Sequence, residues 1–148
     1  MLFTVATGYA LQALASLPED GSYAMAKDLA ENLHLPAPYL AKILQSLARA
    51  EILESVRGPK GGFRLARPAH RITVGEVLIA MEGVGTLDRC VMGFAHCDSE
   101  NPCPMHDAWS ALKAQVESSM TSTTLRDLQL TKMRRAQGGP VKVRNGRK

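Results

Sequence analysis

All three cysteines of the 148-residue chain lie in one short segment, which runs from Cys90 to His106 and reads CVMGFAHCDSENPCPMH. The residues between the cysteines are mostly small, polar or next to proline, and such residues do not build a hydrophobic core. Thiolates suit zinc, copper(I) and iron–sulfur clusters, and a neutral imidazole completes such sites. We therefore predict a loop that binds a metal ion or a cluster. The predicted ligands are Cys90, Cys97, Cys103 and His106.

The end of this segment also predicts the start of a helix. Proline is favoured at the first helical position, which here would be Pro104. The Cys103 sulfur would then lie at a helix N-terminus, where the dipole stabilises a thiolate, and His106 would follow one turn later on the same face. Three other interpretations stay open: a disulfide with one spare thiol, inert or switch-like thiols, and a structural zinc ion. The spacing of six, five and two intervening residues does not match the paired C-x-x-C spacing of common zinc modules.

Three short helices are predicted before this segment, at residues 4–17, 25–33 and 37–50. The third has a polar and basic outer face opposite an apolar stripe at helical spacing. Two short helices with a tight turn and such a face make either a helix-turn-helix or an ordinary helical hairpin. The stripe consists of Leu40, Ile43, Leu44 and Leu47.

The segment after these helices favours DNA binding. Residues 52–57 and 63–66 have the pattern of two strands around a Gly-Pro-Lys-Gly-Gly turn, and a hairpin directly after a helix-turn-helix is a wing. Its tip carries basic side chains among glycines, which let the backbone approach a phosphate or a narrow groove. The alternative is a purely structural ribbon. The predicted DNA contacts are Pro38, Tyr39, Lys42, Gln45, Arg49, Arg57, Gly58 and Lys60.

The carboxyl-terminal part predicts three further helices, one of them long, and an interface. Thr73 and Glu76 form a capping box that opens a helix to about residue 81, and the longest helix follows Pro104 to about residue 121. Its apolar stripe favours a dimer interface over intramolecular packing. A last short helix, capped at 122–124, ends near residue 130, and residues 131–148 are predicted to be a disordered basic tail. The predicted dimer contacts are Trp109, Leu112, Val116 and Met120.

The formal net charge of +4 is unevenly distributed. Residues 131–148 carry seven basic side chains and no acidic one, residues 36–72 carry seven against two, and residues 73–130 carry three against eight. A positive field confined in this way is expected of a nucleic-acid-binding protein. No apolar run approaches the roughly 18 residues of a membrane span, and the first residues lack the basic region of a signal peptide. We therefore expect a cytoplasmic protein.

Several motifs together resemble a family, the winged-helix transcription regulators typified by IscR and NsrR. The resemblance covers residues 1 to about 130. It rests on the GYAL, YLAKIL, SVRGPKGGFRL, ITVGEV, CPMH and TTLRDL motifs, which begin at residues 8, 39, 55, 72, 103 and 123. It implies a homodimer built on the long helix, two recognition helices in successive major grooves of a palindromic operator, and an iron–sulfur cluster near the dimer interface.

Two departures from the family pattern bear on the cluster. Relatives with a 4Fe–4S cluster can take an acidic fourth ligand from the first helix, and the matching position here is Gly8. His106 falls where the 2Fe–2S members have a histidine ligand, although the first cysteine interval is one residue longer than theirs. The resemblance therefore favours a 2Fe–2S cluster and leaves a 4Fe–4S cluster possible. His106 is the expected fourth ligand, with a plain helix-capping role as the alternative.

These expectations define one architecture. The fold is mainly α-helical with a small β-hairpin: a winged helix-turn-helix domain at 1–82, a cluster-binding loop at 83–104, and a dimerisation helix with a C-terminal helix at 105–130. The predicted function is that of a DNA-binding transcriptional regulator, a repressor or an activator, controlled by the cluster. The alternatives are a regulator with a zinc or thiol-switch site and, with less support, an iron–sulfur carrier. An enzyme is not expected, because three cysteines and a histidine would leave a zinc ion no open position, and no catalytic motif is present.

Overall fold

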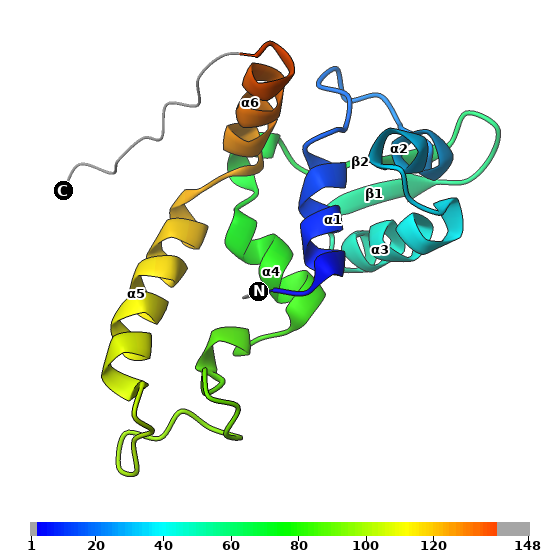
Figure 1. Ribbon diagram of the computed structural model, residues 1–148. Helices are drawn as coiled ribbons and strands as arrows, with labels where there is room; N and C mark the ends of the chain where they lie inside the picture. The colour runs from blue at the N-terminus through cyan, green and yellow to red at the C-terminus, as the bar shows by residue number, and fades with distance from the viewer. Residues whose placement is uncertain (1–2, 139–148) are drawn as a thin grey trace.

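The computed structural model describes residues 3–138 and forms a helical body with one small antiparallel hairpin (Figure 1). Two single turns of 3-10 helix, η1 and η2, lie on either side of α4. The described elements follow the predicted order. In chain order they are α1 (Val5–Leu14), α2 (Ala26–Leu33), α3 (Ala37–Arg49), β1 (Leu53–Val56), β2 (Gly62–Leu65), η1 (Ala69–Arg71), α4 (Val74–Glu82), η2 (Thr86–Asp88), α5 (His106–Ser122) and α6 (Leu125–Ala136).

The hydrophobic core lies where α1, α2 and α3 meet. All four residues of the predicted stripe on α3 are buried there, and Ala10, Ala13 and Leu14 of α1 are fully buried. The turn between α2 and α3 is tight because His34 adopts a left-handed conformation at the end of α2, with φ of 55°, and Pro36 caps α3. The predicted helix-turn-helix is therefore present, with the polar side of α3 facing outward.

The hairpin is held against the helices by backbone pairing. Its register places Glu54 opposite Arg64 and Val56 opposite Gly62. Ala24, just before α2, exchanges two backbone hydrogen bonds of 2.9 and 2.8 Å with Phe63. Gly62 is required at this crossing, because its φ is +145° and a Cβ atom there would lie 2.3 Å from the Ala24 carbonyl oxygen. The wing is thus attached directly to the helix-turn-helix.

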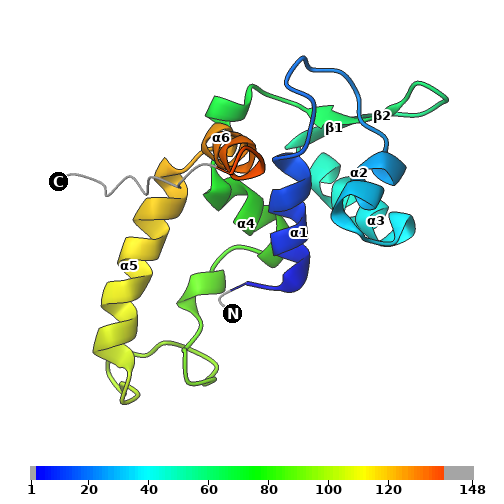
Figure 2. The same cartoon turned by 45° about the horizontal axis from the view of Figure 1, so that its top comes forward.

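A backbone junction closes the second half of the chain. The Val74 N–H donates to the Thr123 carbonyl at 2.8 Å, and the Leu125 N–H donates to the Ile72 carbonyl at 2.9 Å. The junction returns α6 to the core, where Leu125 is fully buried. Between the two ends of the junction, α5 packs chiefly on α4 and stands apart from the helix-turn-helix, whereas α6 lies beside α1 (Figures 1 and 2).

Three predicted boundaries were wrong. The first helix ends at Leu14, not at residue 17, although Leu17 is still buried. The long helix begins at His106 with Met105 as its cap, so Pro104 is not its first residue and Cys103 lies before the helix. A proline disfavours helical backbone in the residue before it, and the chain here makes a turn in which the His106 N–H donates to the Cys103 carbonyl at 3.0 Å.

The third correction concerns the tail. Residues 131–136 were predicted to be disordered, but they continue α6 to Ala136. A capping box formed by Thr124 and Asp127 starts this helix, and its last turn carries Arg134 and Arg135, whose charges suit the C-terminal end of the dipole. The rest of the predicted tail, residues 139–148, lies outside the described residues.

Glu82 ties the end of α4 to the start of α1. One of its carboxylate oxygens accepts hydrogen bonds from the Thr7 hydroxyl and from the backbone N–H and hydroxyl of Thr4, at 2.5, 2.8 and 2.7 Å. The hydroxyl groups of Thr7 and Thr4 hold the pKa of Glu82 below its usual value. A carboxyl whose pKa is lower in the folded state contributes stability above its unfolded pKa, and this contribution is lost as the pH falls through the folded pKa.

We predict that Glu82→Gln lowers the free energy of unfolding at pH 7 by about 1 kcal/mol, allowing for solvent screening. The variant should also lose less stability than the wild type between about pH 5 and pH 3, because the titrating group is gone. Denaturant unfolding at several pH values measures both effects. Glu31→Gln, at an exposed position of α2, is the control, and equal pH profiles for wild type and Glu82→Gln would contradict the prediction.

Candidate metal centre and DNA interface

The cysteine loop is fixed at its base by α5. The Trp109 indole N–H donates to the Arg89 carbonyl at 3.1 Å, and the Lys113 ammonium forms a 2.9 Å ion pair with Asp88. The hydrogen bond to Asp88 is the main cause that raises the pKa of Lys113. Because Arg89 immediately precedes Cys90, these contacts position the first cysteine relative to the helix that begins at His106.

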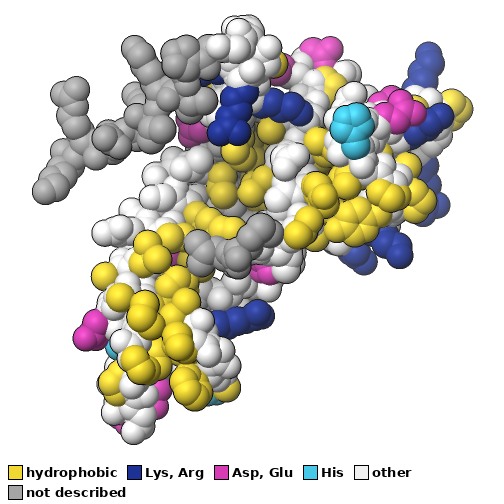
Figure 3. Space-filling model, in the orientation of Figure 1, with side chains coloured by type: hydrophobic (Ala, Val, Ile, Leu, Met, Phe, Trp, Pro, Cys, Tyr) yellow, Lys and Arg dark blue, Asp and Glu magenta, His cyan; other side chains and the backbone are white. Residues whose placement is uncertain are grey.

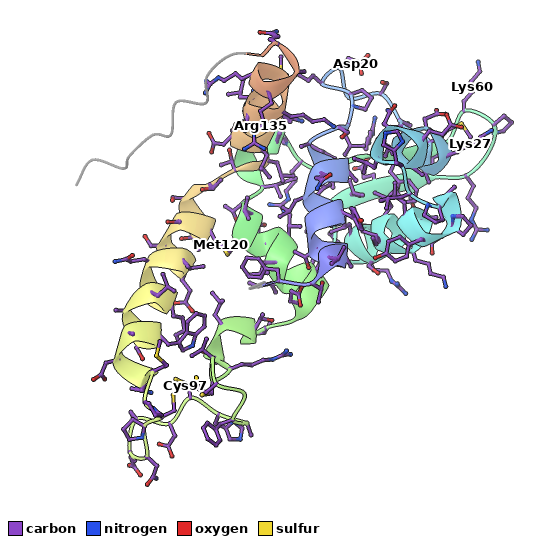
Figure 4. All side chains as sticks on the ribbon, in the orientation of Figure 1. Asp20, Lys27, Lys60, Cys97, Met120 and Arg135 are labelled. Atoms are coloured by element: carbon purple, nitrogen blue, oxygen red, sulfur yellow. The ribbon has the colours of Figure 1, made fainter. Side chains whose placement is uncertain are left out.

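The four predicted ligands form two pairs. The Cys90 and Cys103 sulfurs lie 3.6 Å apart, and the Cys97 sulfur lies 3.4 Å from Nδ1 of His106. All four side chains line one pocket of about 240 Å³, and Figure 4 shows Cys97 with other sulfur atoms close by, at the end of α5 away from the body. The structure therefore brings together every residue predicted from the loop sequence.

The pairing distances agree with shared coordination. Metal–sulfur and metal–nitrogen bonds of about 2.3 and about 2.0 Å in a tetrahedral site place two sulfurs about 3.8 Å apart, and a sulfur and a nitrogen about 3.5 Å apart. The two observed separations are close to these values. However, within residues 3–138 no group of three or more His, Cys, Asp or Glu side chains is arranged to hold one metal ion. Each pair is spaced like two ligands of one metal ion, and all four side chains line the same pocket.

Backbone amides surround the first sulfur. Burial raises the pKa of Cys90, but hydrogen bonds from the Met92 N–H, the Cys103 thiol and the Phe94 and Gly93 N–H groups outweigh it, so the pKa is lowered overall. For Cys103 the balance is reversed: burial and the neighbouring Cys90 sulfur raise the pKa, although the Met105 N–H donates to its sulfur. N–H donors around a sulfur stabilise the thiolate form that binds metal.

The loop between Cys97 and Cys103 has its own internal support. The Asp98 carboxylate accepts from the Glu100 N–H at 2.8 Å and from the Asn101 side-chain amide at 3.2 Å. The same Glu100 and Asn101 contacts lower the pKa of Asp98. This Asx turn, followed by Pro102, separates the backbone directions of the two cysteines. It explains why Cys97 meets His106 while Cys103 meets Cys90.

The predicted DNA contacts form one exposed surface. All eight predicted residues on α3 and on the wing are exposed, including Tyr39, which is 40% exposed and packs edge-on against Tyr9 with ring centroids 6.2 Å apart. Lysine and arginine side chains are visible around this side of the molecule in Figure 3. Lys27, an exposed residue of α2, was not among the predicted contacts, and it lies at the same end of the molecule as Lys60 (Figure 4). The sequence signal that could have identified Lys27 as a DNA contact is its position as a basic residue on the first helix of the helix-turn-helix.

The predicted dimer contacts divide into two groups. Trp109 is buried against the cysteine loop, and Val116 and Met120 are half-buried. Leu112, by contrast, is 48% exposed, and Met105 on the same side of α5 is 45% exposed. Apolar side chains are accordingly visible over α5 in Figure 3. The dimer interface itself stays a prediction. Leu112 is the predicted contact residue whose side chain is most available to a partner.

Comparisons with known proteins agree with this arrangement. The family model named Rrf2, described as an iron-dependent transcriptional regulator, matches residues 3–130. A helix-turn-helix-type transcriptional regulator of Aquifex aeolicus is 31% identical over 131 residues, which are 86% of this chain and 91% of that protein. No helix among the described residues is long and apolar enough to cross a membrane.

Solved structures share the fold. CymR, the global cysteine regulator of B. subtilis, superposes with a TM-score of 0.71 at 24% identity, covering 87% of this chain and 96% of CymR. IscR of T. potens superposes with a TM-score of 0.68 at 25% identity, covering 95% of this chain and 93% of IscR. With a winged helix-turn-helix, an exposed basic face and a family match over 3–130, the chain belongs to the Rrf2 family of transcriptional regulators.

Proposed function

We propose that this chain is a homodimeric DNA-binding regulator whose activity is controlled by a 2Fe–2S cluster bound through Cys90, Cys97, Cys103 and His106. The observation that carries the proposal is the division of the four side chains into two pairs, at 3.6 and 3.4 Å. A 2Fe–2S cluster has two iron atoms that each need two protein ligands. A single zinc ion would instead need all four donors around one point, and zinc is therefore the alternative that the metal assay below tests.

The chain's own residues suit a labile, controllable centre. When bound, the cluster supplies a redox-active group that oxidants or iron scarcity can remove. His106 would hold the cluster together with Cys97, whose sulfur lies 3.4 Å from its Nδ1. The amides around Cys90 stabilise its thiolate, and the exposed Met92 and Phe94 side chains form an apolar rim near the pocket.

The DNA interface follows from the exposed side of α3 and from the wing. Tyr39, Lys42, Gln45 and Arg49 would face the major groove, while Arg57 and Lys60 would contact the backbone or the minor groove. A dimer through α5 would present two copies of this surface and so would match a palindromic operator. The position of α5 away from the helix-turn-helix, with Leu112 exposed, supports that dimer.

The direct test of the cofactor is anaerobic purification followed by a visible spectrum and assays for iron, sulfide and zinc. The proposal expects about two iron and two sulfide ions per chain. One zinc ion per chain without sulfide would favour the zinc alternative and overturn the proposal. Protein with neither metal and three titratable thiols after anaerobic reconstitution would also overturn it.

We predict that His106→Ala shifts the visible spectrum and shortens the lifetime of the cluster in air, because Cys97 loses its partner ligand. His106→Cys should retain the cluster with altered absorption, since a thiolate replaces the imidazole. His70→Ala, an exposed histidine far along the chain from the loop, is the matched control. An alanine variant with parental spectrum, iron content and lifetime would show that the fourth ligand comes from another residue.

We predict that the double variant Arg57→Ala and Lys60→Ala weakens DNA binding and flattens its salt dependence by about one unit of log–log slope per lost phosphate contact. Binding is measured at several salt concentrations on a fragment selected from random-sequence DNA. The variant Arg134→Ala and Arg135→Ala removes the same charge from α6 and is the control. If the wing variant behaved like this control, the wing would not be a DNA contact.

We predict that Leu112→Asp dissociates the dimer, because it would bury a carboxylate against an apolar surface. The dissociation constant should rise roughly 100-fold or more, which corresponds to a few kcal/mol. Ala114→Asp introduces the same charge at an exposed position on the opposite side of α5 and should leave the dimer intact. Light scattering that still reported a dimer for Leu112→Asp would place the interface elsewhere.

A further inference from the structure

We infer that Cys90 and Cys103 form an intramolecular disulfide when the cluster site is empty, and that this bond blocks reloading until it is reduced. The inference rests on the proposed function, because it concerns the state of the same loop after cluster loss. It assigns distinct fates to the three thiols, with Cys97 as the one that stays free. The disulfide would thus persist in the loop after the cluster is lost, until a reductant cleaves it.

The geometry points to this pair. The two sulfurs lie 3.6 Å apart, and a disulfide bond of about 2.05 Å requires them to approach by only about 1.5 Å. Cys103 is held between Pro102 and Pro104, whose rings restrict the backbone on both sides. Cys90 begins a turn in which the Gly93 N–H donates to the Cys90 carbonyl at 3.0 Å, and Gly93 has a φ of 90°. The small adjustment therefore falls on side-chain rotation rather than on rebuilding of the loop.

Cys97 is directed elsewhere. Its sulfur lies 3.4 Å from Nδ1 of His106, and the turn built by Asp98 orients the following backbone. Every described cysteine is a free thiol in this structure, so three candidate pairings exist. Of these, the sulfur–sulfur contact within hydrogen-bond range is the one between Cys90 and Cys103.

The chemistry is a two-electron oxidation by a peroxide. One sulfur of the pair attacks the peroxide, and the O–O bond breaks to give a sulfenic acid and one water molecule; the step is written here for Cys103, and the same products form if Cys90 attacks first. The Cys90 sulfur then attacks the Cys103 sulfur, the S–O bond breaks, and the hydroxide leaves as water with the proton of the thiol. In sum, two thiols and one hydrogen peroxide give one disulfide and two water molecules.

The consequence for the site follows directly. The two sulfurs that form one donor pair are both consumed, while the Cys97 and His106 pair survives. Two of the four ligands are then absent, so iron and sulfide cannot rebuild the cluster. A dithiol reductant restores both thiolates at once, because the bond is a disulfide rather than a higher oxide of sulfur.

The experiment uses the full chain freed of iron by an anaerobic chelator and fully reduced. It is then treated with one equivalent of hydrogen peroxide, alkylated and mapped by mass spectrometry. We expect a peptide pair joined through Cys90 and Cys103, with Cys97 alkylated. Reconstitution with iron and sulfide should slow at least tenfold after peroxide and recover with dithiothreitol. Cys97→Ser should still form the bond, whereas Cys90→Ser and Cys103→Ser should not, with circular dichroism to check their fold.

Three results would overturn the inference: three alkylated thiols after peroxide, a disulfide that includes Cys97, or a covalent dimer on a non-reducing gel. The matched control His106→Ala keeps every thiol and should form the same bond. Failure of the proposed function is recognised separately. If the mapped disulfide forms but the reduced chain takes up no iron and sulfide, the disulfide between Cys90 and Cys103 is supported and the proposed cluster is contradicted.

Discussion

The architecture depends on the two backbone hydrogen bonds that join residues 72–74 to residues 123–125. From this junction the chain continues as α4, which packs on α1 and α3, then runs through the cysteine loop and α5, and returns to the core as α6. The junction brings Leu125 into the core, where it is fully buried, and it fixes the end of α5 beside the start of α4. The helix-turn-helix is therefore connected to the cysteine loop and α5 by this short antiparallel contact and by α4, which packs on α1 and α3 and buries Val77 in the core.

Much of the fold was accessible from local pattern. Helical spacing identified the stripe on α3, the Thr73 and Glu76 capping box identified the start of α4, and the glycine-rich turn identified the wing. These features depend on neighbours within a few residues, so they can be identified from the sequence alone. The extension of α6 to Ala136 was missed because residues 131–136 carry three basic side chains and none of them is buried, so no apolar pattern marks this part of the helix.

The sequence could predict that the four side chains of the candidate metal site lie close together, but not how they pair. Spacing placed His106 beside Cys103 on one helical face, whereas His106 contacts Cys97 and Cys103 contacts Cys90. The proline on each side of Cys103 and the Asx turn at Asp98 decide this, and both act through backbone direction rather than through periodicity. Similarly, Trp109 belonged to an apolar stripe, but its indole N–H found a carbonyl in the adjacent loop.

The segment between the two halves of the junction, which contains the cysteine loop and α5, is expected to unfold separately from the rest of the protein. The helix-turn-helix and α6 share the buried core, whereas the segment from Gly83 to Ser122 touches the remainder mainly through α4. Segments with few buried contacts open at a lower free energy than the global transition. The loop and α5, which make up about a quarter of the chain, can therefore exchange their amide hydrogens as a separate unit while the helix-turn-helix stays folded.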